Sequence, residues 1–151
     1  MTTATGFTAG LTTEQRARLR TLARPVSFPP GHRVFDEGEH ADRFWIVSGG
    51  PVALDVQVPG RPAPVVETLG PGDLLGWSWL FEPYRWHLGA RTLGAVTAEE
   101  FDAAAVRTAC EQDTGFGYAV ARAVAAVVGQ RLKATRIRLL DLYAPPLGGG
   151  R

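Results

Sequence analysis

The chain has 151 residues, of which 45% are hydrophobic and 21% are charged, and its formal net charge is +1. These values are typical of one soluble globular domain with a proper core. A net charge near zero provides no field that would attract nucleic acid or an anionic membrane. The single cysteine, Cys110, has no partner for an internal disulfide, so we expect a buried thiol in a cytoplasmic protein. No signal peptide pattern and no apolar run of transmembrane length is present.

The first two thirds of the chain predict a short helix followed by strands. Residues 1–10 are small and polar, which indicates a flexible leader. Thr12 and Gln15 form a capping box for a helix that ends before Pro25. Short apolar segments then alternate with glycine and proline turns, which predicts a small antiparallel barrel or roll. The expected strands cover residues 33–35, 44–47, 52–58, 65–69, 86–92 and 93–98.

The last third is predicted to be helical. Asp102 can cap a helix over about residues 102–112, and Asp113 or Thr114 can cap a longer one over residues 114–143. Residues 144–151 are expected to form a disordered tail.

The longer helix carries two apolar stripes. One stripe can cover the β-roll, and it consists of Val120, Val124 and Val127. The other has heptad spacing, which favours pairing with a second copy of the chain; a single amphipathic helix lying on its own domain is the alternative. The expected dimer seam consists of Ala121, Ala125, Val128, Leu132, Thr135, Leu139 and Leu142.

Residues 70–91 contain the clearest candidate for a binding site. Turn residues lead to Gly76, a short helical turn is expected next, and Arg85 follows within a group of aromatic residues. Free backbone N–H groups at a helix start and a guanidinium both suit phosphate, so this stretch predicts an anion cradle. We expect Trp79, Phe81 and Trp86 to fill the core, or Trp77 and Tyr84 to stack on a planar ligand or form a partner-binding patch.

A series of short motifs runs through residues 26–143. They are Gly31, Phe35-x-x-Gly38, Asp42-x-Phe44-x-Ile46, Ser48-Gly49, Val52, Leu69-Gly70-Pro71-Gly72-Asp73-x-x-Gly76 and Arg131-Leu132. In order and spacing these resemble the cyclic nucleotide-binding domain of catabolite-activator (Crp/Fnr-type) regulators. The resemblance implies an α+β domain over residues 11–143: an antiparallel β-roll at about 26–101, of the double-stranded β-helix or cupin-like jelly-roll kind, with a short N-terminal helix and a long C-terminal dimerisation helix.

The resemblance also implies a ligand site. In such domains the loop after the Gly76 equivalent is a phosphate-binding cassette, in which a glutamate accepts the ribose 2′-hydroxyl and an arginine neutralises the phosphate. Here Trp77 stands at the glutamate position and has no acceptor, while Arg85 lies near the arginine position. Glu82 can supply the missing carboxylate that accepts the ribose hydroxyl; the alternative is that Glu82 is an ordinary surface residue of the loop. The implied ligand-binding residues are Gly76, Trp77, Ser78, Tyr84, Arg85 and Thr135, of which Thr135 falls where the family places a helix hydroxyl against the purine.

The sequence favours a non-enzymatic, homodimeric sensor of cyclic AMP, cyclic GMP or a related anionic ligand. The alternative is a degenerate β-roll that binds no nucleotide and acts as a protein-interaction or assembly module. No metal, further cofactor or catalysis is expected, because the histidines lack ligand spacing and no nucleophile triad is present. Family regulators carry a helix-turn-helix domain after the long helix and this chain stops there, so direct DNA binding is not expected, nor is membrane association.

Overall fold

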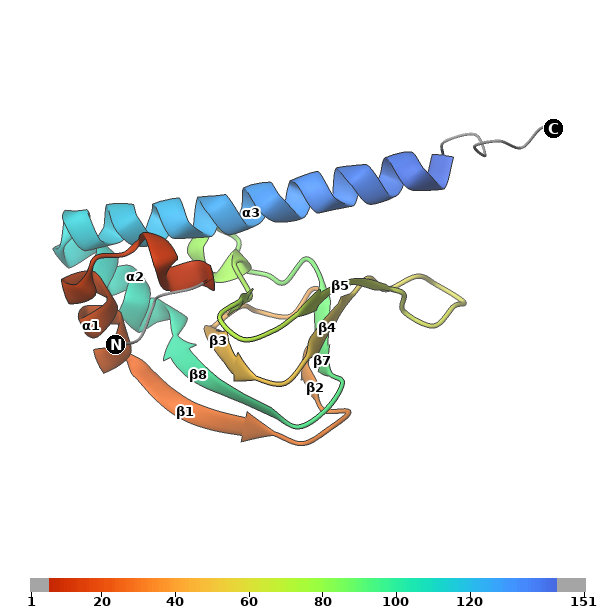
Figure 1. Cartoon of the computed structure of the whole chain (residues 1–151), viewed down its shortest axis with the longest axis horizontal. Helices are drawn as coiled ribbons and strands as arrows, with labels where there is room; N and C mark the ends of the chain where they lie inside the picture. The colour runs from red at the N-terminus through yellow and green to blue at the C-terminus, as the bar shows by residue number, and fades with distance from the viewer. Residues whose placement is uncertain (1–5, 144–151) are drawn as a thin grey trace.

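The computed structural model describes residues 6–143, without the side chains of Arg138, Leu142 and Tyr143. Within this range the chain forms an antiparallel β-roll with a long helix along one side (Figure 1), which confirms the predicted fold class. Three expectations lie outside the described residues. They are the start of the leader at 1–5, the tail at 144–151 and the Leu142 side chain of the expected seam.

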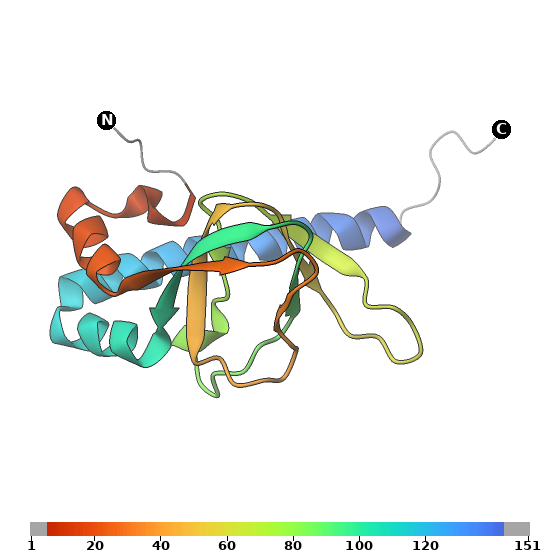
Figure 2. The same cartoon turned by 90° about the horizontal axis from the view of Figure 1, so that it is seen from below.

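Two four-stranded antiparallel sheets make up the β-roll. The first has the order β1 (Ala23–Phe28), β8 (Val96–Asp102), β3 (Arg43–Gly49) and β6 (Leu74–Leu75). The second has the order β2 (Arg33–Phe35), β7 (Gly89–Thr92), β4 (Val52–Asp55) and β5 (Val65–Leu69). Seen from below, the strands of the two sheets surround a common interior (Figure 2), which buried apolar side chains fill.

The predicted strands at residues 33–35 and 65–69 are confirmed, whereas several other predicted strand ends are wrong. Strand β1 is missing from the prediction because Pro25 suggests a break; β1 is an edge strand paired only with β8, where a proline is tolerated. The expected strand 52–58 ends at Asp55, where the pairing with β5 shifts register. Residues 86–88, expected to begin a strand, lie in a loop, and the expected strand 93–98 is replaced by β8.

The helices follow the predicted capping residues. Helix α1 (Thr13–Thr21) begins with the complete Thr12–Gln15 capping box. Helix α2 (Ala103–Gln112) is capped by Asp102, whose carboxylate accepts a hydrogen bond from the Ala104 amide. At the start of α3 (Thr114–Tyr143) the Asp113 carboxylate accepts from the Phe116 amide at 3.2 Å.

Local side-chain burial agrees with most of the helix predictions. Val120 and Val124 of α3 are fully buried against the roll, and Val127 is half-buried. Cys110 of α2 is half-buried rather than buried, and desolvation raises the pKa of its thiol, which makes it unreactive.

The N-terminal segment departs from the expected leader. Residues 6–10 form a short 3-10 helix, η1 (Gly6–Gly10), and its Phe7 side chain is only 4% exposed. The Phe7 amide donates to the Gly72 carbonyl at 3.0 Å, which ties η1 to the turn before β6. Residues 6–10 therefore belong to the folded domain and form one wall of a cavity described below.

The C-terminal half of α3 extends past the β-roll (Figure 1). Leu132 is 69% exposed and Leu139 is 52% exposed, and Ala121, Ala125 and Thr135 are also exposed. Val128 of the expected seam is instead half-buried and packs against the core. The other described seam residues are exposed on a single chain, and the dimer stays a prediction.

Glu100 of β8 is the hub of a buried polar network. It accepts hydrogen bonds from the Trp45 indole at 3.0 Å and from the Arg24 guanidinium at 2.9 Å, and its side chain is 8% exposed. Burial alone would raise the pKa of Glu100, but the hydrogen bonds from Arg24 and Trp45 outweigh it and hold the pKa below its usual range.

A Glu100→Gln variant should be less stable at pH 7 by about 1–3 kcal/mol, because a buried charge-assisted hydrogen-bond network is lost. The folded-state pKa of Glu100 lies below its usual range, so this stabilisation is fully present above the pKa of the unfolded chain and is lost as the pH falls through the folded-state pKa. Thermal denaturation should therefore show a gap between variant and wild type that is largest at neutral pH and closes in acid. Glu99→Gln is the matched control, and a gap of equal size there would contradict the assignment.

Candidate functional site

The cassette loop is held in place by two tryptophans. After β6, Gly76 adopts a positive φ of 95°, and a Cβ at this position would lie 2.5 Å from the Trp86 ring, so only glycine fits. The indole N–H of Trp79 donates to the Gly76 carbonyl at 3.0 Å, and the Trp79 ring stacks on Phe44 with centroids 4.0 Å apart. A short 3-10 turn, η2 (Ser78–Leu80), follows Gly76 as the sequence predicts.

The aromatic residues divide between core and surface. Trp79 and Trp86 are buried, and Trp86 stacks on Phe35 with centroids 4.0 Å apart, so the core prediction is confirmed for both. The same prediction is wrong for Phe81, which is 50% exposed where the chain leaves η2 in an extended conformation. Trp77 is half-buried and stacks on His87.

The hollow beneath the cassette is small. Gly76, Trp77 and Ser78 line it together with Trp86, His87 and Arg131, and its volume is about 20 Å³. A cavity of this size holds about one water molecule. The Ser78 hydroxyl is already engaged, since its Oγ lies 3.0 Å from Nδ1 of His87.

The other predicted ligand residues lie elsewhere. The Arg107 guanidinium covers the Tyr84 ring at 4.1 Å from its centroid. Arg85 donates to the Gly38 carbonyl at 3.1 Å and is exposed. Thr135 is exposed on α3. The structure therefore brings together Gly76, Trp77 and Ser78 but does not place Tyr84, Arg85 or Thr135 with them in this hollow; the ligand-binding role of all six stays a prediction.

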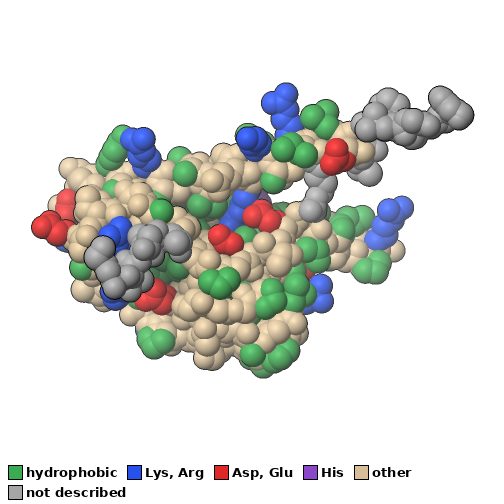
Figure 3. All heavy atoms as spheres, viewed as in Figure 1, with side chains coloured by type: hydrophobic (Ala, Val, Ile, Leu, Met, Phe, Trp, Pro, Cys, Tyr) green, Lys and Arg blue, Asp and Glu red, His purple; other side chains and the backbone are tan. Residues whose placement is uncertain are grey.

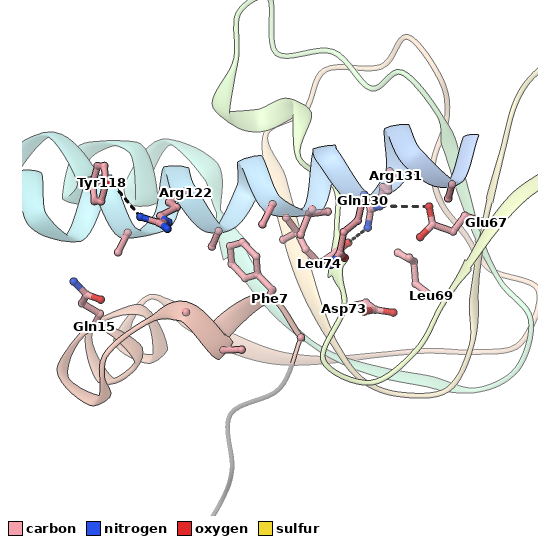
Figure 4. Close-up of a pocket in the computed structure, with 18 of the residues that line it drawn as sticks. Phe7, Gln15, Glu67, Leu69, Asp73, Leu74, Tyr118, Arg122, Gln130 and Arg131 are labelled. Carbon is pink, nitrogen blue, oxygen red and sulfur yellow. Dashed lines mark hydrogen bonds and ion pairs between the residues drawn. The ribbon is translucent and has the colours of Figure 1, made fainter. Parts of the chain in front are cut away.

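A much larger cavity shares Arg131 with this hollow. It has a volume of about 970 Å³ and opens between η1, β5, β6 and α3 (Figure 4). Phe7, Leu69, Leu74 and Val127 supply apolar walls. Figure 3 shows basic and acidic side chains together in the furrow between α3 and the roll. The cavity depends on the docking of η1, which the sequence alone does not reveal.

Arg131 lines both the large cavity and the hollow beneath the cassette. Its side chain is 13% exposed, Nη2 donates to the Leu74 carbonyl, and Nε lies 3.6 Å from Oε1 of Glu67 (Figure 4). Burial lowers the pKa of Arg131, and the charges of Glu67 and Asp73 oppose this effect. Arg131 was visible in the sequence only as part of the Arg131-Leu132 motif.

The comparisons with known proteins match this architecture. The cyclic nucleotide-binding domain family matches residues 25–113. The chain belongs to this family. A CRP-like cAMP-activated global transcriptional regulator of Mycobacterium tuberculosis is 31% identical over 145 residues, which cover 95% of this chain and 62% of that protein. Within the family the chain is thus homologous to CRP-like regulators and spans less than two thirds of the length of this relative.

Solved structures of family members have the same fold. A protein of Geobacter metallireducens GS-15 is 30% identical with a TM-score of 0.73, covering 83% of this chain and 91% of that one. A cyclic nucleotide-binding domain from Methylobacillus flagellatus reaches a TM-score of 0.80 at 14% identity, covering 91% of this chain and 77% of that one, which shows a shared fold only. Among residues 6–143, no helix has the length and apolar character needed to span a bilayer, and no three His, Cys, Asp or Glu side chains are grouped as metal ligands.

Proposed function

We propose that this cyclic nucleotide-binding domain is a non-enzymatic, cytoplasmic sensor of a cyclic nucleotide or a related anionic nucleotide-like ligand. The observation that supports it most directly is the cavity of about 970 Å³ beside the cassette, which contains a mostly buried guanidinium. Its volume lies in the range of about 300–1,000 Å³ typical of small-molecule sites.

The proposed output runs through α3. This helix forms one side of the cavity and continues past the roll to the exposed seam around Leu132 and Leu139. A ligand between α3 and the roll contacts both elements, so it favours one placement of α3 over others. Pairing of α3 with a second copy, over residues 114–143, then carries the change to a partner or output domain.

Cyclic AMP and cyclic GMP are the ligands to titrate first, with adenosine as the control that lacks the phosphate. Because Trp77 and Trp86 line the hollow next to Arg131, binding should change tryptophan emission and raise the melting temperature. We expect an affinity about 5- to 150-fold weaker than that of a site with the ribose carboxylate, because Trp77 supplies no acceptor. No change at millimolar cyclic nucleotide would refute nucleotide sensing.

A second candidate function is a protein-interaction module that binds no nucleotide. The small volume of the hollow beneath the cassette, about 20 Å³, favours it, as does the half-exposed side chain of Phe81. Two results together would support this module: no nucleotide binding in the titration, and a protein partner that binds stoichiometrically whether or not nucleotide is present. Measurable binding of a cyclic nucleotide would exclude it.

A further inference from the structure

We infer that a polar pocket on the outer face of the second sheet binds an acidic segment of a protein partner, with Arg61 and Arg91 as its anion-binding residues. This outer pocket has a volume of about 650 Å³ and lies between β2, β7 and residues 56–64, the loop that joins β4 to β5. Among the described residues, none that lines it also lines the cassette hollow or the large cavity. The outer pocket is therefore separate from the site of the proposed sensor.

The outer pocket faces away from the interior of the roll. Successive side chains of a strand point to opposite faces of its sheet. Leu54 of β4 lines the hollow beneath the cassette, whereas the next residue, Asp55, lines the outer pocket. A partner can therefore occupy this pocket without entering the roll.

The outer pocket contains more cationic than anionic side chains. Three arginines and two carboxylates line it. Arg33 already holds both carboxylates, since it donates to Asp55 at 2.5 and 2.9 Å and to Asp36 at 2.6 Å. Arg61 and Arg91 form no ion pair and no side-chain hydrogen bond with any residue that the structure describes. Two guanidiniums thus remain available to an external anion.

The sheet register places Arg91 where an added anion is stabilising. Arg91 lies directly opposite Arg33 of β2, and its partner on the other side is the uncharged Ala53 of β4. Like charges at directly opposed positions of neighbouring strands are destabilising. Because Arg91 is half-buried, water and salt screen an anion beside it less than at a fully exposed position. A carboxylate bound at Arg91 therefore offsets a repulsion that the chain itself leaves uncompensated.

The loop between β4 and β5 holds Arg61 beside these strands. Its first part is fixed by the Gln57 amide, which donates to the Glu37 carboxylate at 3.0 Å. The Val56 amide donates to the Pro64 carbonyl at 3.2 Å and closes the base of the loop. Three prolines in the loop restrict its backbone further. A loop that is ordered before binding loses little conformational entropy when a partner binds.

The exposure of the pocket's cations favours a protein segment over a free anion. Arg61 is exposed, and an exposed ion pair contributes little by itself because water and salt screen it. A free anion forms only such contacts here. A segment with several carboxylates combines them in one molecule and also packs against Pro62 and Ala63 of the pocket wall. The loop projects from the end of the roll, where a second protein can reach it (Figures 1 and 2).

A dye-labelled hexaglutamate peptide is the probe for this pocket, and labelled hexaglutamine is its uncharged counterpart. Fluorescence anisotropy should show saturable binding of hexaglutamate to the wild-type chain that weakens as the salt concentration rises. Arg61→Gln/Arg91→Gln should weaken this binding by about 5- to 30-fold, as expected for two largely exposed ion pairs.

Arg20→Gln/Arg136→Gln is the control variant with the same change in net charge. Both arginines are exposed, lie outside the outer pocket and form no side-chain contact with a described residue. The affinity of this control for hexaglutamate should stay within about twofold of the wild type. Melting curves without peptide show that both double variants are folded.

Three results would overturn the inference: no binding of hexaglutamate at millimolar concentration, equal binding of hexaglutamine, or equal losses in the two double variants. Displacement of bound hexaglutamate by millimolar inorganic phosphate would assign the pocket to a free anion and would refute the protein partner. Cyclic nucleotide takes no part in these measurements, so their failure leaves the proposed sensor function unaffected.

Discussion

Replacing Leu132 and Leu139 together with glutamate should convert the protein from a dimer to a monomer. Both side chains lie on the heptad seam of α3 and are more than half exposed on one chain. Burying a leucine in an apolar contact contributes about 1.5–3 kcal/mol, so losing two on each copy weakens dimerisation by well over about 100-fold. Sedimentation or light scattering at micromolar concentration measures the change in mass directly.

Ile137 and Leu140 provide a matched control on the same helix. They are 51% and 59% exposed, which is similar to the seam leucines. Each residue advances an α-helix by about 100°, which places Ile137 about 140–160° and Leu140 about 80–100° around the helix axis from Leu132 and Leu139, so both control residues lie outside the seam. Glutamate at both control positions should leave the dimer intact. A monomeric wild type, or a dimer that only the control pair disrupts, would contradict the seam.

Features with local causes were predictable from the sequence. The Thr12–Gln15 capping box involves residues three apart, and the structure contains both of its hydrogen bonds. The buried stripe of Val120 and Val124 follows from helical periodicity alone. The order of turns between short apolar segments was sufficient for the β-roll, because hairpin turns carry their own sequence signals.

Features that depend on contacts between distant residues were not predictable. Strand β1 exists because β8 pairs with it across 68 to 78 positions of the sequence, an interaction that overrides the break suggested by Pro25. Phe7 is buried because its backbone binds at Gly72, so a segment that looks like a polar leader becomes part of the core. That docking supplies one wall of the large cavity, whose lining residues come from five elements: η1, α1, β5, β6 and α3.

In the candidate site, too, the local features were predictable from the sequence and the contacts between distant residues were not. The sequence located the cassette, because Gly76 must adopt a positive φ and its neighbours form a recognisable motif. It did not reveal that Trp86 fills the space beneath Gly76 or that Arg85 binds the Gly38 carbonyl. A resemblance transfers the position of a loop, whereas side-chain packing decides which cations remain available to a ligand.

Replacing Arg33 with methionine should destabilise the protein by about 3 kcal/mol, near the lower end of the range for breaking a buried ion pair. Arg33 of β2 holds the Asp55 carboxylate of β4 with two hydrogen bonds, of 2.5 and 2.9 Å. The Asp55 side chain is 3% exposed and would be left charged and unpaired, while Arg33 is 38% exposed, which reduces the loss. A fall in melting temperature of about 6–12 °C is expected for a chain of this size.

Arg91 is the control for this ion pair, because it lies directly opposite Arg33 in the β2–β7 register and has no ion pair within the described residues. Arg91→Met should change stability by less than about 0.5 kcal/mol. Gly89→Ala should lower the free energy of unfolding about as much as Arg33→Met does. A Cβ at residue 89 would lie 2.1 Å from Nη2 of Arg33 and 2.5 Å from Oδ1 of Asp55, so it would push the two partners of the ion pair apart.

The double variant Arg33→Met/Asp55→Leu separates the cost of an unpaired charge from the value of the pair. Removing both partners leaves no buried charge, and such apolar replacements are often neutral, so the double variant should recover most of the about 3 kcal/mol lost in Arg33→Met. Chemical denaturation of the four proteins of the cycle measures the coupling. If the double variant is less stable than Arg33→Met alone, the pair contributes through its specific geometry, and the unpaired Asp55 charge is not the cause of the loss.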